Sequence, residues 1–253
     1  MTTALLLDTA SPAARPPVVT VGATRTLRTT SMLVGSLFLI ATATFATGNA
    51  LVAGVLSEPA YLTVVTAHTG ALSIGALLAF VQGVAIVLIA VLLFPLLKQH
   101  SESLALAYVG FRVAELAATL FYVATPLLAI QLGSTLPGGP GDASSARPLE
   151  ALLTSQHSVA IVLIYLVTGV NGTILSGLLL RSGLVPRSLA ILGLFGYPVL
   201  FTGAVLAMSQ VVDVTQGVGL LALVPGGIYE LLLPLWLIKR GLGATAVRRG
   251  QVR

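Results

Sequence analysis

The stretch Thr69–Leu97, TGALSIGALLAFVQGVAIVLIAVLLFPLL, contains no charged residue and one strongly polar side chain, Gln82. A run of about 20 apolar residues is long enough to cross a hydrocarbon core of about 30 Å. Backbone polar groups in lipid must be satisfied within their own segment, so a run of this kind is helical. This stretch therefore predicts a transmembrane helix.

Five more apolar runs of similar length follow the same pattern. Together the runs predict an all-α, polytopic transmembrane bundle of six helices, at about residues 31–56, 69–97, 104–132, 158–180, 189–208 and 217–238. The composition agrees, because 56% of the residues are hydrophobic and only 8% are charged. A soluble domain has about a quarter of its residues charged.

The segments between and around the spans divide the chain further. Residues 1–30 carry three prolines and no helical periodicity, and we expect a disordered cytoplasmic tail without signal-peptide character. Residues 133–150 begin with GSTLPGGPGDASSAR, which is typical of a flexible loop, here an outer one. Residues 239–253 form a basic cytoplasmic tail.

The distribution of basic residues predicts the orientation. With both termini in the cytoplasm, 11 of the 13 Lys and Arg residues lie inside: Arg15, Arg25, Arg28, Lys98, Arg181, Arg187, Lys239, Arg240, Arg248, Arg249 and Arg253. Because the basic residues sit between apolar runs, they indicate topology and not a nucleic-acid surface. The lipid bilayer is the expected partner.

Three ionisable residues fall inside the predicted spans: Arg112 and Glu115 in the third, and Glu230 in the sixth. Intramembrane charges usually face the bundle interior and pair with one another. Arg112 and Glu115 share a helix face at i, i+3. Arg112 and Glu230 lie at similar depths, so the third and sixth spans can bring all three together. Such a cluster can clamp the two helices together or bind a solute or an ion, and the sequence leaves both open.

Other polar residues support the candidate site. Gln82 in the second span and Tyr165 and Asn171 in the fourth can line a cavity or form interhelical hydrogen bonds. Tyr229, next to Glu230 in the sixth span, is a further supporting candidate. Pro225, Gly226, Gly227 and Pro234 flank Glu230 and weaken its helix on both sides, a feature of transporter sites. In the fourth span, Thr168, Gly172 and Ser176, and likewise Gly169, Thr173 and Gly177, predict close packing within the bundle or in a homo-oligomer.

Motifs for most chemistries are absent. The chain has no Cys, no HExxH, no P-loop, no dinucleotide fingerprint and no GxSxG elbow. We therefore expect no metal, no cofactor and no catalytic residue, although an intramembrane enzyme remains a third alternative.

Three segments carry a family resemblance: Tyr108–Glu115 (YVGFRVAE), Leu179–Arg187 (LLRSGLVPR) and Ile228–Gly241 (IYELLLPLWLIKRG). They resemble a bacterial family of six-span membrane proteins known as domain of unknown function 4386, over about Arg28 to Gly241. The resemblance implies a multi-pass protein of a bacterial cytoplasmic membrane and singles out Arg112, Glu115 and Glu230, but it implies no activity.

Two functional hypotheses stand side by side. The first is a permease for a small solute, with proton coupling through one glutamate and Arg112 as its charge partner. The two three-span blocks would have opposite orientations, which is compatible with an inverted repeat. The second is a membrane sensor or accessory protein that binds partners through the small residues of the fourth span. A water-accessible cavity at Glu230 would favour the first, and an exposed small-residue stripe the second.

Overall fold

The structure is a computed structural model, and it describes residues 21–135, 142–213 and 217–243. Its elements are α1 (Val21–Leu56), α2 (Tyr61–Leu97), α3 (Glu102–Thr135), α4 (Asp142–Ser182), α5 (Arg187–Met208), a 3-10 helix η1 (Gly217–Ala222) and α6 (Val224–Lys239). The described residues contain no strand. The predicted all-α bundle with six spans is confirmed, since six helices are long and apolar enough to cross a membrane.

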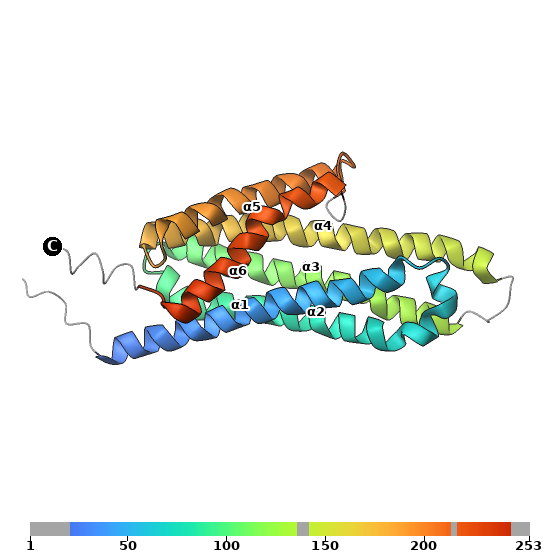
Figure 1. Ribbon diagram of the computed structural model, residues 1–253, viewed down its shortest axis with the longest axis horizontal. Helices are drawn as coiled ribbons and strands as arrows, with labels where there is room; N and C mark the ends of the chain where they lie inside the picture. Colours follow the sequence, from blue (N-terminus) through green and yellow to red (C-terminus); the bar gives the residue numbers. More distant parts are fainter. Residues whose placement is uncertain (1–20, 136–141, 214–216, 244–253) are drawn as a thin grey trace, which may run out of the picture.

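The helices form a closed ring in chain order. Each helix packs against the next one, and α6 returns to pack against α1 (Figure 1). α1 begins and α6 ends at the same end of the bundle, where the α2–α3 and α4–α5 turns also lie. This end carries Arg28, Lys98, Arg181, Arg187 and Lys239, and it is called the basic end below.

Several helices are longer than the hydropathy pattern predicts. α1 starts at Val21, within the expected tail, and α4 starts at Asp142, within the expected loop. Residues 1–20, 136–141 and 244–253 of those segments lie outside the described residues. Hydropathy marks only the part of a helix that matches the lipid thickness. The ends of α2, α3 and α4 project beyond α5 and α6 at the end opposite the basic end (Figure 1).

An acidic residue organises this projecting end. Glu150, expected in a loop, lies in α4 and accepts a hydrogen bond from the backbone N–H of Leu62 at 3.0 Å. Ala60 precedes α2 in a left-handed conformation and offers no side-chain cap. The first N–H groups of a helix need partners from outside the helix, so Glu150 caps α2 from the neighbouring α4.

The sixth span is split, whereas the sequence predicts one continuous helix. Residues 217–222 form the 3-10 helix, and α6 begins at Val224 with Pro225 in its first turn. Proline lacks an N–H and has a fixed φ, which suits the first turn of an α-helix and not its interior. Pro225 therefore sets the junction next to Gly226 and Gly227.

Glycines allow the closest helix contacts. A Cβ on Gly172 of α4 would lie 2.4 Å from the ring of Tyr197 in α5, and one on Gly169 would lie 2.7 Å from the Cβ of Phe201. Thr168 and Ser176 are buried as well. Gly169 and Gly172 of the small-residue stripe therefore pack against α5 within one chain.

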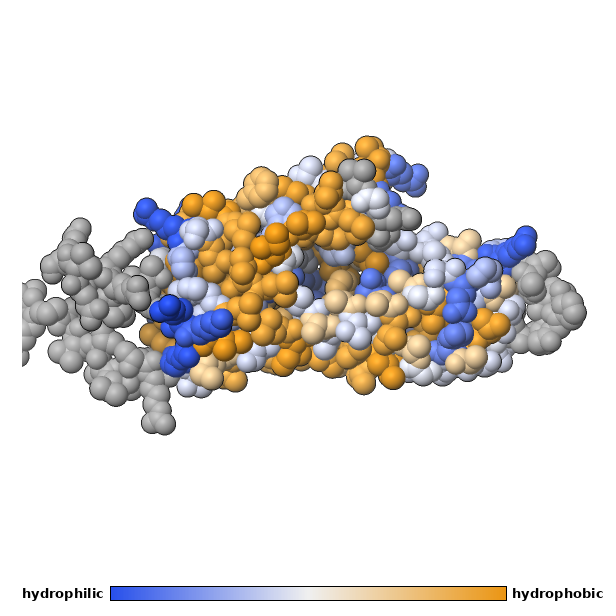
Figure 2. All heavy atoms as spheres, in the orientation of Figure 1, coloured by the Kyte–Doolittle hydropathy of each residue, from blue (hydrophilic) through white to orange (hydrophobic). Residues whose placement is uncertain are grey.

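The outer surface of the ring is apolar. Leu77, Leu106, Ile191 and Phe195 are more than half exposed, and the hydrophobic colour covers most of the side of the bundle in Figure 2, with hydrophilic residues gathered toward its two ends. A patch this extensive marks contact with a membrane. The protein is a multi-pass membrane protein.

We expect Gly172→Ala to lower the midpoint of thermal unfolding in detergent, because its methyl group meets the buried ring of Tyr197 and overpacking costs about 1–3 kcal/mol. Gly110→Ala in α3 is the matched control, since its Cβ would meet nothing within 4 Å. An equal loss in both variants would contradict the close α4–α5 contact.

Candidate functional site

A cavity of about 240 Å³ lies inside the ring and touches all six helices. It is hollowed into the side of the bundle between α1 and α6, with hydrophilic atoms at its floor (Figure 2). Its polar lining comes from Thr42, Gln82, Arg112, Glu115, Tyr165, Thr168 and Glu230. Its apolar walls include Phe38, Phe45, Ile86, Ile164, Leu200 and Leu223. The three intramembrane charges therefore share one cavity.

Arg112 forms its ion pair within its own helix. Its Nη1 lies 2.9 Å from Oε2 of Glu115, and both side chains are 3% exposed. The i, i+3 spacing holds the two groups on one face of α3. The described residues contain no Arg112–Glu230 contact within 4.0 Å. The ion pair of Arg112 therefore lies within α3 and does not clamp the third span to the sixth.

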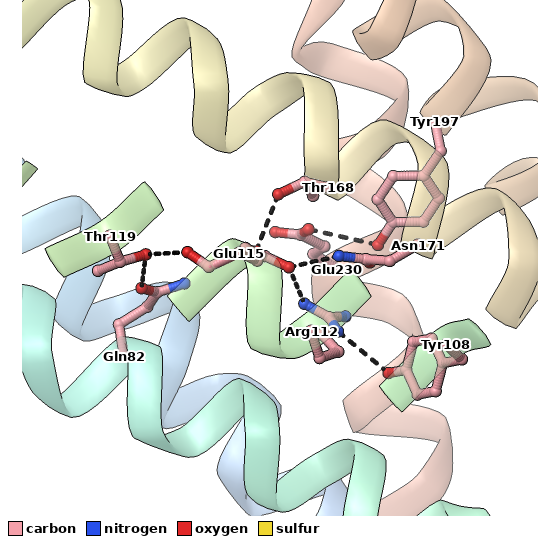
Figure 3. Close-up of polar contacts among 9 residues, drawn as sticks. All are labelled: Gln82, Tyr108, Arg112, Glu115, Thr119, Thr168, Asn171, Tyr197 and Glu230. Atoms are coloured by element: carbon pink, nitrogen blue, oxygen red, sulfur yellow. Dashed lines mark hydrogen bonds and ion pairs between the residues drawn. The ribbon is translucent and has the colours of Figure 1, made fainter. Parts of the chain in front are cut away.

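The carboxylate of Glu115 joins α3 to α4 instead. Thr168 Oγ1 donates to its Oε1 at 2.8 Å, and Asn171 Nδ2 donates to its Oε2, which also accepts from Arg112 (Figure 3). A carboxylate can accept about four hydrogen bonds, and three of these positions are filled. Glu115 is therefore a fully buried structural acceptor.

Arg112 is enclosed by aromatic rings. Its Nε donates to the hydroxyl of Tyr108 at 3.2 Å. Its guanidinium carbon lies 5.4 Å from the ring centroid of Tyr108 and 5.9 Å from that of Phe38. Cations within about 6 Å of an aromatic ring are stabilised by the ring quadrupole. The charge of Arg112 is therefore balanced by Glu115 and stabilised by the rings of Tyr108 and Phe38.

Glu230 differs from Glu115 in its burial and in its partners. It is only half-buried, and no cationic side chain lies within 4.0 Å of it among the described residues. Its one hydrogen bond within the described part of the chain comes from the hydroxyl of Tyr197 in α5, at 3.3 Å (Figure 3). Since Arg112 and Glu115 cancel, an ionised Glu230 gives the cavity a net charge of −1.

The supporting residues have different roles. Asn171 binds Glu115, and Gln82 lines the cavity and accepts from Thr119 at 3.4 Å. Tyr229 lies outside the cavity lining, fully buried, with its ring 5.4 Å from that of Tyr197 in an edge-on arrangement. It supports the tyrosine that binds Glu230.

Three residues of the site were not predicted to belong to it: Thr168, named only for helix packing, Tyr108, named only within a family segment, and Tyr197. Thr168 precedes Asn171 by three residues, so the two share a face of α4, and this spacing could have indicated a polar pair for Glu115. Tyr108 lies one turn before Arg112 in the same way. Nothing in the sequence near Tyr197 connects it to Glu230, which is 33 residues away.

The remaining ionisable residues of the described chain form no metal-binding group. In residues 21–135, 142–213 and 217–243, no three His, Asp or Glu side chains are placed to hold a metal ion. His157 packs its ring 4.8 Å from that of Tyr122 in the core. His68 pairs with Glu58 at 3.3 Å on the projecting end.

Six apolar helices in a closed ring, with a polar cavity inside, define a polytopic helical membrane protein with an internal pocket. The chain belongs to the family described as Domain of unknown function (DUF4386), whose model matches residues 33–241. This match confirms the resemblance seen in the sequence. No curated protein matches the chain, and no solved structure matches it.

Neutralising the two glutamates separately gives opposite expectations. Glu115→Gln leaves Arg112 as an unpaired buried charge, which costs about 3–5 kcal/mol. Glu230→Gln removes no ion pair and can still accept from Tyr197, so we expect a change within about 1 kcal/mol, or a gain. Thermal unfolding in nanodiscs measures both. Similar losses in the two variants would contradict the assigned pairing.

Proposed function

We propose that the protein is a small permease that binds its solute in the central cavity and uses Glu230 as the binding and proton-carrying carboxylate. One observation carries the proposal: Glu230 lines the cavity half-buried, and no cationic side chain of the described residues lies within 4.0 Å of it, while Arg112 and Glu115 pair with each other. An unpaired intramembrane carboxylate is costly and by default marks a functional site.

The stability of the fold does not account for Glu230. The joining of helices falls to Glu115, which binds side chains of α4. Glu230 adds a single hydrogen bond of 3.3 Å. A neutral glutamine would serve the packing as well without the cost of desolvating a charge. The carboxylate is therefore best explained by what it binds.

The helix around Glu230 favours movement. The 3-10 to α junction at Leu223 and Val224 precedes Gly226 and Gly227, and Pro234 removes the donor for the carbonyl of Glu230. Interrupted helices beside an ionisable group are typical of transporter binding sites. Bending at these points would expose Glu230 alternately to the two sides of the membrane.

The groups that face Glu230 define its proton chemistry. α5 contributes Tyr197, α4 contributes Tyr165, and α3 contributes the Arg112–Glu115 pair. The cavity residues from α1 and α2 carry no titratable group. Glu230 is thus the group whose charge can change with solute binding, and Arg112 serves as a fixed positive charge.

The basic end faces the cytoplasm of a bacterial cell, as expected from the positive-inside rule.

The sensor or accessory-protein hypothesis needed an exposed small-residue stripe on α4, and the packing of Gly169 and Gly172 against α5 supports the permease over it.

Access to the cavity tests the permease directly. Because the chain has no Cys, Thr42→Cys supplies a single thiol in the cavity lining. We expect a membrane-impermeant methanethiosulfonate reagent to modify it in both right-side-out and inside-out vesicles, since alternating access opens the cavity to each side in turn.

Val113→Cys is the matched control, because Val113 adjoins Arg112 in α3 but is 51% exposed on the apolar surface. It should not react from either side. Absence of modification at Thr42→Cys from both sides, in folded protein, would overturn the permease. Modification from one side only would replace the permease by a binding protein.

A further inference from the structure

We propose that the cavity receives the head group of a cationic amphiphile, a quaternary ammonium carrying an alkyl chain, which enters sideways from the bilayer between α1 and α6. This inference rests on the proposed function and names its substrate class. Three features carry it: the lateral opening, the charge and aromatic character of the lining, and the size of the cavity.

The opening lies on the side of the bundle. α1 and α6 touch near the basic end, where a Cβ on Gly35 would lie 2.9 Å from the carbonyl oxygen of Pro234. Beyond this contact the two helices diverge (Figure 1), and the hollow between them faces outward at mid-length of the bundle (Figure 2). Ala46 of α1 and Gly227 of α6 line the cavity and are exposed. A bound molecule can therefore extend into lipid.

The lining favours a cation over an anion. Glu230 has no cationic partner among the described residues, whereas Arg112, the cation of the cavity, is held by Glu115, Tyr108 and Phe38. An anionic head group would have to displace Glu115 from Arg112 and approach Glu230. A cation completes the charge balance of the cavity at no such cost.

The aromatic residues favour an organic cation over a metal ion. Phe45 and Tyr165 line the cavity together with Phe38, and both are half-buried. Aromatic faces next to a carboxylate are the usual means of binding quaternary ammonium groups. A hard metal ion needs about six oxygen ligands, and the cavity walls are mostly apolar.

The volume favours a head group with its chain outside. A cavity of about 240 Å³ is below the usual range of about 300–1,000 Å³ for pockets that enclose a drug-sized ligand. A trimethylammonium group fits, and a long alkyl chain does not. The lateral gap gives the chain a path into the bilayer.

The test uses three amphiphiles with one C12 chain and different heads: dodecyltrimethylammonium, dodecyl sulfate and dodecanol, each below its micellar concentration. The readout is the rate at which Thr42→Cys is modified in vesicles. We expect the ammonium compound to slow modification about fivefold or more, and the other two to leave the rate within about twofold. Equal protection by all three, or by none, would overturn the cation proposal and leave the accessible cavity of the permease standing.

Two variants identify the contacts. In the Thr42→Cys background, Glu230→Gln should abolish the protection, because it removes the carboxylate but retains the hydrogen bond from Tyr197. Gly227→Leu should also abolish it by filling the opening, and no atom within 4 Å of its Cβ opposes the side chain. Protection that persists in Glu230→Gln would overturn the role of the carboxylate.

The source of the ligand is tested with tetramethylammonium, which has the same head and no chain. If the head group is captured from the bilayer, tetramethylammonium should protect at least about tenfold less well than the C12 compound at equal aqueous concentration. Equal potency would overturn lateral entry. If Thr42→Cys is never modified in any vesicle, the permease itself fails, which is a separate result.

Discussion

The pairing of Arg112 with Glu115 inside the hydrocarbon region is the interaction on which the rest of the site depends. A guanidinium in lipid is stable only with a counter-charge and further donors or acceptors around it. The helix supplies the counter-charge three residues away, and Thr168 and Asn171 of α4 complete the carboxylate. Because this unit is neutral and joined to α4 by two side-chain hydrogen bonds, it fixes α3 against α4, and this contact between helices does not require Glu230.

As a consequence, the two carboxylates of the cavity have different surroundings. Glu115 lies at 3% exposure among four polar partners on α3 and α4, counting the Thr119 hydroxyl on its backbone carbonyl. Glu230 sits across the cavity on the shortest helix of the ring, beside a 3-10 to α junction and a proline. Glu115 is held by several hydrogen bonds, whereas Glu230 lies on an interrupted helix, and an interrupted helix beside an ionisable group is the feature on which the permease proposal rests.

The sequence determines some features of this structure and not others. It determines the six spans and places three charges inside them, but it does not determine the split of the sixth helix near Glu230. Spans follow from the demands of lipid on any backbone, and hydropathy therefore finds them. The partner of Arg112 does not follow from the sequence. A glutamate at i+3 and a glutamate at equal depth on another helix both satisfy the rule that intramembrane charges pair with one another. The 3-10 segment before Pro225 and the packing of Gly172 on Tyr197 depend on neighbouring helices, which no local pattern contains.

The most direct measurement is a pair of double-mutant cycles that combine Arg112→Gln with Glu115→Gln and, separately, with Glu230→Gln, read by unfolding free energy in nanodiscs. We expect a coupling of about 2–3 kcal/mol for Arg112 with Glu115, and no more than about 0.5 kcal/mol for Arg112 with Glu230. A large coupling with Glu230 and a small one with Glu115 would contradict this pairing, because Glu230 would then be the structural partner of Arg112 and could not be the carboxylate left free for a solute.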